Sequence, residues 1–200
     1  MTLSRLRSDK GATIPLFVWV VGMVLFAAFV FFVFAKGAVA RSGAQSAADA
    51  SALAAAQDVR DELRLEFIAG LPTGVWVLPL EGKIPSPGNG IAGAQRLAAE
   101  NDSRLLGVNP TFVRGDLAYE ARIETNYTVG DSLVPGTEDT RARADATAVI
   151  EPRCKMLANV PGQTIEFTCD GSGLWVIDPK TFNAGDLPTA KELYEVNLAE

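Results

Sequence analysis

The feature that most constrains this chain is an uncharged stretch of 25 residues near its N-terminus, over 11–35. Fifteen of residues 12–35 are Phe, Val, Leu or Ile. As a helix rising 1.5 Å per residue, the stretch is about 37 Å long, enough to cross a hydrocarbon core of about 30 Å. A buried core helix is rarely this long and this uniformly apolar. The sequence therefore predicts a transmembrane helix over residues 12–35.

Charge is distributed unevenly along the chain. Residues 1–41 carry five Lys/Arg against one Asp, a net charge of +4, whereas residues 42–200 carry 13 Lys/Arg against 23 Asp/Glu, a net charge of −10. The excess of basic residues ahead of the span predicts a cytoplasmic head over 1–11 and an acidic body outside the inner membrane. An acidic body lacks the clustered Lys/Arg that nucleic-acid binding needs, so no nucleic-acid partner is expected.

A cleaved signal peptide is the main alternative to a retained anchor. The tripeptide Ala38-Val39-Ala40 has the small-x-small form of a signal-peptidase site. The apolar run is longer than the 7–15 residues of a signal peptide, and Lys36 separates it from that site. We therefore expect the anchor to be retained.

A second helix signal follows the span without a break. Residues 38–66 contain no proline and are rich in alanine, which has the highest helix propensity. Small and apolar residues recur there at three- and four-residue steps and form one stripe: Ala48, Ala52, Ala55 and Val59, continued by Leu63 and Phe67. We expect a helix over 36–69 whose stripe packs on partner helices, with Gln45 and Asp49 as polar specificity points. The alternative, left open by the sequence, is that this helix docks on the chain's own domain.

These two segments resemble a known family. The residues that carry the resemblance are Lys10-Gly11-Ala12-Thr13 before the span and Arg41-Ser42-Gly43-Ala44-Gln45-Ser46-Ala47-Ala48-Asp49-Ala50-Ser51-Ala52-Leu53-Ala54-Ala55-Ala56 after it. This pattern is similar to the N-terminal segment of TadE/TadG-like Flp pilus-assembly proteins, most of all to actinobacterial TadG-related members. The resemblance covers residues 10–62. It implies a single-pass accessory protein that contacts other pilus-assembly or pseudopilin subunits through its N-terminal helix.

One departure from the pilin-like members of that family concerns processing. Those that are cut by prepilin peptidase carry a glutamate five residues after the glycine, whereas here Leu16 stands five residues after Gly11, next to Pro15. We therefore predict that the head is not removed at Gly11.

The rest of the chain is predicted to be a small α+β domain outside the membrane. Residues 70–91 are rich in Pro and Gly and predict a linker, in which Trp76 and its valine neighbours suggest a short strand. For the domain over 92–200, periodicity predicts one helix packed on a small antiparallel sheet. The helix is expected over 92–106 and the strands over 111–114, 117–129, 141–150, 164–169 and 174–177.

The two cysteines, Cys154 and Cys169, are expected to form a disulfide. An even pair outside the cytoplasm favours a disulfide, and Pro161-Gly162 midway between them suggests a hairpin that brings them together. Closing a loop of about 15 residues is worth about 3 kcal/mol in the chain-entropy model. Two buried free thiols are the alternative.

Other motifs give weaker signals. The run Gly88-Asn89-Gly90-Ile91-Ala92-Gly93 matches a dinucleotide-binding fingerprint but follows no strand, so we interpret it as a loop that enters a helix. The acidic residues Asp131, Glu138 and Asp139 lack the regular spacing of a calcium loop.

The composition disfavours catalysis. The chain has no histidine, so it has no His-based triad, no His metal ligand and no base to activate a cysteine. Two cysteines are too few for a zinc site with four thiolate ligands. No cofactor, metal or enzymatic activity is expected. The leading hypothesis is a pilus-assembly accessory protein, and the alternative is a membrane-tethered extracellular ligand-binding module unrelated to pili.

Overall fold

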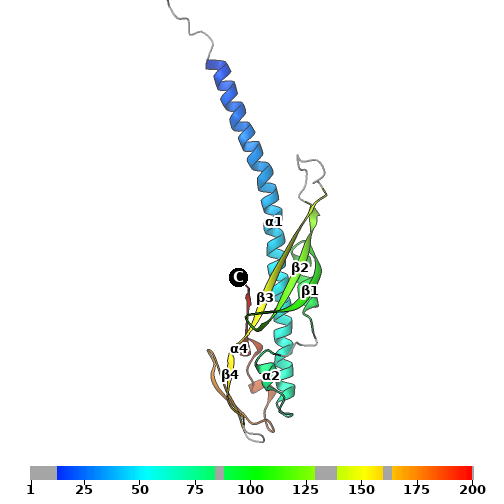
Figure 1. Cartoon of the computed structure of the whole chain (residues 1–200), viewed down its shortest axis with the longest axis vertical. Coiled ribbons are helices and arrows are strands. Elements are labelled where there is room, and N and C mark those ends of the chain that lie inside the picture. Colours follow the sequence, from blue (N-terminus) through cyan, green and yellow to red (C-terminus); the bar gives the residue numbers. More distant parts are fainter. Residues whose placement is uncertain (1–12, 84–87, 129–138, 160–163, 200) are drawn as a thin grey trace, which may run out of the picture.

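The computed structural model describes residues 13–83, 88–128, 139–159 and 164–199 of the chain. A single helix, α1 (Thr13–Gly70), includes 58 of them. Both expected helical segments, the apolar span and the alanine-rich stretch, therefore form one continuous helix. In Figure 1 the N-terminal part of α1 extends beyond both sheets, which lie alongside its C-terminal part. Among the described residues, α1 is the one helix long and apolar enough to cross a membrane.

Helix α1 ends where the chain turns back tightly on itself. A Cβ on Gly70 would lie 2.9 Å from the backbone N of Trp76, so the close approach of these two segments requires a glycine. Trp76 is 1% exposed and has helical φ and ψ angles, and it precedes the short helix α2 (Val77–Leu80). The short strand expected around Trp76 is therefore wrong, because this indole packs into the core at a helix start.

A third helix leads into the larger sheet. Helix α3 (Ile91–Glu100) is shorter than expected, because Asn101 and Asp102 (φ +48°) turn the chain and β1 (Ser103–Val113) begins. The sequence placed residues 103–106 in the helix and the first strand only at 111–114, and both assignments are corrected here. The hydrophobic spacing of this segment fits either structure; hydrogen bonding to the next strand decides in favour of a strand.

The larger sheet has four antiparallel strands in the order β1-β2-β3-β7. Strands β2 (Asp116–Thr128) and β3 (Arg141–Pro152) lie close to their expected bounds, whereas β7 (Tyr194–Leu198) was not predicted. One face of this sheet packs on α1, and α3 lies beside both α1 and β1. Many side chains on the other face are exposed, among them Arg122, Arg143 and Asp145.

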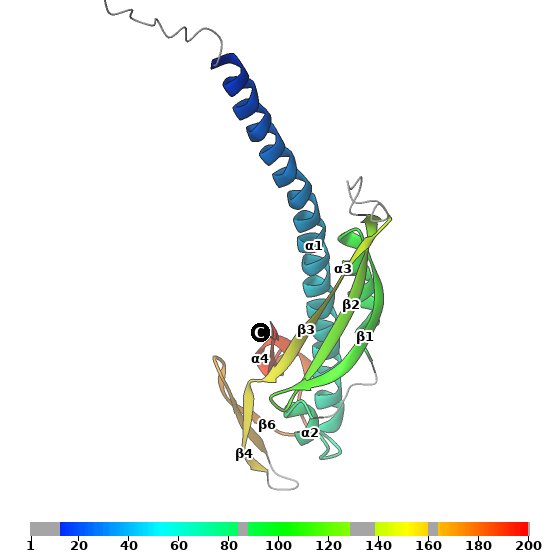
Figure 2. The same cartoon turned by 45° about the horizontal axis from the view of Figure 1, so that its top comes forward.

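A second, smaller sheet makes the architecture richer than the single sheet expected from the sequence. It has three antiparallel strands in the order β4-β5-β6: β4 (Cys154–Asn159), β5 (Ile165–Cys169) and β6 (Gly173–Ile177). Figure 2 shows this sheet at the far end of the molecule from the free part of α1. A 3-10 turn (Ala184–Asp186) and α4 (Ala190–Leu193), which has a Thr189/Glu192 capping box, connect it to β7. The α+β class is confirmed.

The hydrophobic core joins α1 to both sheets. Its largest fully buried side chains come from α1, the α2 segment, β2, β5 and β7, and include Phe67, Trp76, Tyr119, Phe167 and Tyr194. The Phe67 ring meets both Trp76 and Phe167 edge to face, with centroids 6.3 and 5.8 Å apart. The Tyr194 hydroxyl donates a 2.6 Å hydrogen bond to the carbonyl oxygen of Pro79, which satisfies a buried polar group.

Candidate functional site

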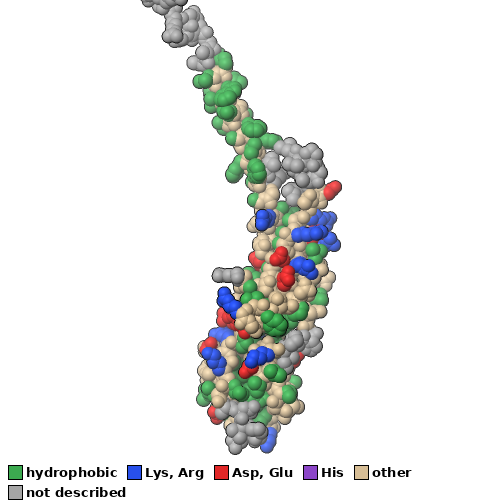
Figure 3. All heavy atoms as spheres, in the orientation of Figure 1, with side chains coloured by type: hydrophobic (Ala, Val, Ile, Leu, Met, Phe, Trp, Pro, Cys, Tyr) green, Lys and Arg blue, Asp and Glu red, His purple; other side chains and the backbone are tan. Residues whose placement is uncertain are grey.

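The N-terminal part of α1 is a helix with apolar side chains exposed on every side. Large side chains there are exposed by between 37% and 76%, the highest being Phe31 and Phe34. The most apolar 18-residue window contains no buried residue. Figure 3 shows hydrophobic side chains covering this part of α1, and Lys and Arg side chains where the helix meets the domain. An exposed apolar surface of this length suits the hydrocarbon core of a bilayer rather than water.

The domain begins to cover α1 at Ala40, which is 5% exposed, one residue before the exposed Arg41. Gly43 lies under Tyr127 at the end of β2, so close that a Cβ on Gly43 would overlap the tyrosine Oη. A side chain at position 43 would therefore displace this ring. The contact fixes the height of the sheet along the helix, close to the end of the apolar segment.

The alanine stripe is buried inside the chain itself. Ala48, Ala52, Ala55 and Val59 are all 0% exposed, as are Leu63 and Phe67 further along. They pack against side chains of α3 and the larger sheet, among them Ala98, Tyr119, Ala121 and Ile123. The sequence left open whether this stripe packs on partner helices or on the chain's own domain. In the structure it packs on the chain's own domain. These four side chains present no free surface to a partner helix.

The two polar residues of this segment face outward. The Gln45 amide nitrogen donates to Asp49 Oδ1 at 2.8 Å and also lies 3.4 Å from the carbonyl oxygen of Asp145 on β3. Gln45 is exposed and Asp49 half-buried. They add a polar connection between α1 and β3 at the rim of the packed stripe.

The glycine-rich run that resembles a nucleotide fingerprint is instead the point where α3 meets α1. Gly90 (φ +62°) lies so close to α1 that a Cβ would come within 2.5 Å of the Ala55 Cα and 2.7 Å of its carbonyl carbon. Gly93 approaches Asp58, whose carboxylate accepts a 2.9 Å hydrogen bond from the Gly93 N–H. The N-cap residue Gly90 has no side chain, and the first turn of α3 instead has acceptors from Asp58 on the neighbouring helix and from Asn89, whose Oδ1 accepts a 3.1 Å hydrogen bond from the Ile91 N–H.

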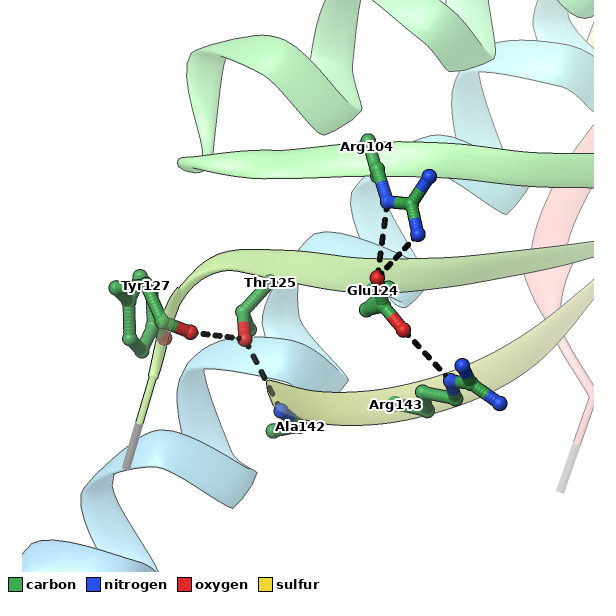
Figure 4. Close-up of polar contacts among 6 residues, drawn as sticks. All are labelled: Arg104, Glu124, Thr125, Tyr127, Ala142 and Arg143. Carbon is green, nitrogen blue, oxygen red and sulfur yellow. Dashed lines mark hydrogen bonds and ion pairs between the residues drawn. The ribbon is translucent and has the colours of Figure 1, made fainter. Parts of the chain in front are cut away.

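An ionic cluster on the open face of the larger sheet was not foreseen (Figure 4). The Glu124 side chain on β2, 7% exposed, lies between Arg104 on β1 and Arg143 on β3. Arg104 donates to Glu124 Oε2 through Nε, at 2.9 Å, and Nη2, at 2.5 Å, and Arg143 Nε donates to Oε1 at 2.8 Å. Hydrogen bonds from the two guanidinium groups hold the pKa of the Glu124 carboxyl below its ordinary value.

The same end of the sheet carries a second set of polar contacts. The Thr125 hydroxyl donates to the Tyr127 carbonyl oxygen at 2.8 Å and accepts a 3.1 Å hydrogen bond from the Ala142 N–H (Figure 4). The alternation in both strands indicates which residues share a face. It does not reveal the register, and only the register places Glu124 opposite Arg143.

The predicted disulfide is confirmed. Cys154 is the first residue of β4, and Cys169, the last residue of β5, lies directly opposite it. Both cysteines are buried in the core that α1 shares with the sheets. The bridge therefore ties the smaller sheet to the main core. The Pro161-Gly162 turn that motivated the hairpin lies outside the described residues.

Within the part of the chain that the structure describes, no group of three or more Cys, Asp or Glu side chains is placed to hold a metal ion. Of the acidic residues considered for calcium, Asp131 and Glu138 lie outside the described residues, and Asp139 is exposed.

The N-terminal segment, which includes the span and part of the docked helix, is similar to a known family. Residues 11–58 match the TadE/G-like Flp pilus-assembly family model. The match lies within residues 10–62, on which the resemblance was based, and covers about a quarter of the chain; the actinobacterial subtype stays a prediction. The Tad-like segment includes the whole apolar span and the first part of the docked helix, up to Asp58. No curated protein and no solved structure matches the chain.

Proposed function

We propose that this protein is a single-pass inner-membrane accessory component of an Flp/Tad-type pilus-assembly or secretion system, which acts through protein–protein contacts. The observation that carries the proposal is the match of residues 11–58 to the Tad-like family, over the span and the helix that supports the domain. Its N-terminus is cytoplasmic and its α+β domain extracytoplasmic. The basic residues ahead of the span and a disulfide on the other side support this orientation.

We propose further that the protein has a non-enzymatic role and keeps both its head and its anchor. The sequence contains no histidine to serve as a base. Leu16, rather than a glutamate, stands five residues after Gly11. The alternative signal-peptidase site at 38–40 lies inside continuous helix, and Ala40 is buried. The intact mass of the membrane form tests this: loss of residues 1–11 or 1–40 would contradict it.

The test of function separates an assembly component from a module that the span merely tethers. Cutting the chain after residue 70 is unsuitable, because α1 residues 40–70 contribute to the core. We therefore propose to replace residues 14–34 with an unrelated apolar helix of equal length and to leave the docked helix unchanged. If the span contacts pilus-assembly subunits, the chimera inserts normally but loses co-purification with them and loses pilus formation.

A chimera that assembles pili as the parent does would show that the span only anchors the domain. A parent protein that co-purifies with no Tad component would contradict the pilus proposal itself and favour the ligand-binding module. Protease digestion of sealed vesicles of known orientation gives the topology: digestion of the domain only from the extracytoplasmic side agrees with the proposal.

A further inference from the structure

The end of the domain nearest the span carries arginine side chains at a fixed height along α1. Arg41 is on α1 itself, and Arg141 is the first residue of β3, paired with Thr128 on β2. Next to Thr128, Tyr127 reaches α1 at Gly43. Arg41 and Arg141 are exposed, and Tyr127 is 39% exposed. Two guanidinium groups and one phenol therefore belong to the end of the domain where α1 leaves the apolar segment, and Arg141 shares the exposed face of β3 with Arg143.

The geometry of a continuous helix places this end close to the lipid headgroups. Arg41 follows Ala35, the last residue of the uncharged stretch, by six positions, or about 9 Å along the axis, and Gly43 follows it by about 12 Å. The polar layer on each side of the hydrocarbon core is about 5–7 Å thick. Long arginine side chains reach back toward that layer, and tyrosine is enriched there.

Arg41 and Arg141 have no ion-pair partner among the described residues. Another two arginines, further along the sheet from the span, do have one. These are Arg104 and Arg143, which share the single carboxylate of Glu124 and whose side chains remain 57% and 72% exposed. Asp139, exposed two residues before Arg141, is the nearest acidic residue along the described chain and opposes an anion at this end. An anion that binds at this end of the domain must therefore pair directly with the guanidinium groups.

We propose that this end of the domain, through Arg41 and Arg141, binds the phosphate groups of anionic phospholipids in the membrane that α1 crosses. The inference rests on the proposed membrane-spanning role of α1. Guanidinium groups bind phosphate through paired hydrogen bonds, and basic residues near a span attract anionic lipid. Together with the unbroken helix, such contacts hold the domain upright on the membrane surface.

The test uses the full chain in nanodiscs of equimolar phosphatidylglycerol and phosphatidylcholine, and native mass spectrometry counts the lipids that stay bound. We expect the parent protein to retain phosphatidylglycerol preferentially. Arg41→Gln/Arg141→Gln should lower that preference at least about threefold, since each basic residue near the surface contributes separately. Asp139→Asn should raise it. The matched control, Arg114→Gln/Lys155→Gln, removes two exposed positive charges far from the span and should change nothing.

Several results would overturn this inference. One is an equal preference in the parent protein and Arg41→Gln/Arg141→Gln, and another is an equal loss in the control. If the double variant loses co-purifying proteins while lipid retention is unchanged, the site binds an acidic protein segment instead. Carbonate extraction separates the two proposals: a chain that does not insert contradicts the membrane anchor, whereas an inserted chain without lipid preference contradicts only the lipid site. Matching circular dichroism spectra show that the variants fold.

Discussion

At the scale of single residues, the positions that accept the fewest residue types are those where two backbone segments are in contact. Gly90 combines a left-handed backbone with an approach to Ala55 that leaves no space for a Cβ. A motif that resembles a phosphate-binding loop thus has a packing role: its glycines let α3 lie directly on α1. Sequence spacing alone does not distinguish the two roles, because both need residues without side chains.

Gly90→Ala should therefore destabilise the domain strongly. The left-handed conformation costs a non-glycine residue about 1–3 kcal/mol, and the clash with Ala55 adds about 1–3 kcal/mol. Denaturant unfolding of the full chain in detergent micelles measures the change. Gly74→Ala is the matched control, because Gly74 also has positive φ (+78°) but a Cβ added there would have nothing within 4 Å. An equal effect of the two substitutions would contradict the packing role.

Glu124 should make the stability of the sheet depend on pH. Because Arg104 and Arg143 lower its pKa in the folded state, the carboxylate stabilises the fold above the unfolded pKa of about 4.3. That contribution is lost as the pH falls through the lower folded value. Glu124→Gln should therefore lower the Tm at pH 7, and its difference from the parent should shrink toward pH 3.

Circular dichroism melts across this pH range measure the effect. Glu120→Gln is the control, because Glu120 lies on the same face of β2 and its cross-strand neighbours are the uncharged Asn109 and Thr147. A Glu124→Gln difference that stays constant from pH 7 to pH 3 would show that the two arginines do not stabilise the carboxylate.

At the scale of elements, α1 has two unlike parts within one helix. The most apolar window of the first part contains no buried residue, and the second part contributes much of the core. Enlarging Ala52 to Leu would disrupt the chain's own core, because Ala52 is fully buried there, and so would not test contact with a partner helix. The periodicity predicted the buried face correctly, but the surface that covers it is made of segments distant in sequence.

The disulfide belongs to this scale because it joins β4 to β5 and holds the smaller sheet in the core. Cys154→Ser/Cys169→Ser should lower the free energy of unfolding by about 3 kcal/mol, the loop-closure value for a separation of 15 residues. Denaturant unfolding of the parent with and without reductant should show the same loss. If reduction leaves the unfolding midpoint unchanged, the bridge does not stabilise the fold.

At the scale of the whole molecule, an unbroken helix couples the membrane to the domain. Val39 lies between the span and the docked part and is 71% exposed, so its side chain makes little contact with the core. A proline there removes one backbone hydrogen bond and its ring clashes with the preceding turn. Val39→Pro should therefore bend or break α1 between the span and the docked part without unfolding the domain.

The distance between spin labels at positions 24 and 57, both on exposed faces of α1, tests this prediction. In a straight helix these positions lie about 50 Å apart along the axis. The parent protein and Val39→Ala should give a narrow distance distribution near that value. Val39→Pro should give a shorter and broader one, and an unchanged distribution would contradict rigid coupling.

The sequence by itself determined the features that depend on neighbours along the chain. Continuous apolar composition predicts the span, and alanine periodicity predicts the buried face of the helix that continues it. Alternation of residue types predicts the central parts of β2 and β3, and the pair of cysteines predicts one disulfide. Tertiary structure decided which surfaces meet. The alanine stripe faces α3 and the larger sheet, residues 103–106 form a strand because β2 is available as a partner, and Glu124 lies between two arginines. Such contacts join residues far apart in sequence, and their register depends on the packing of the whole domain.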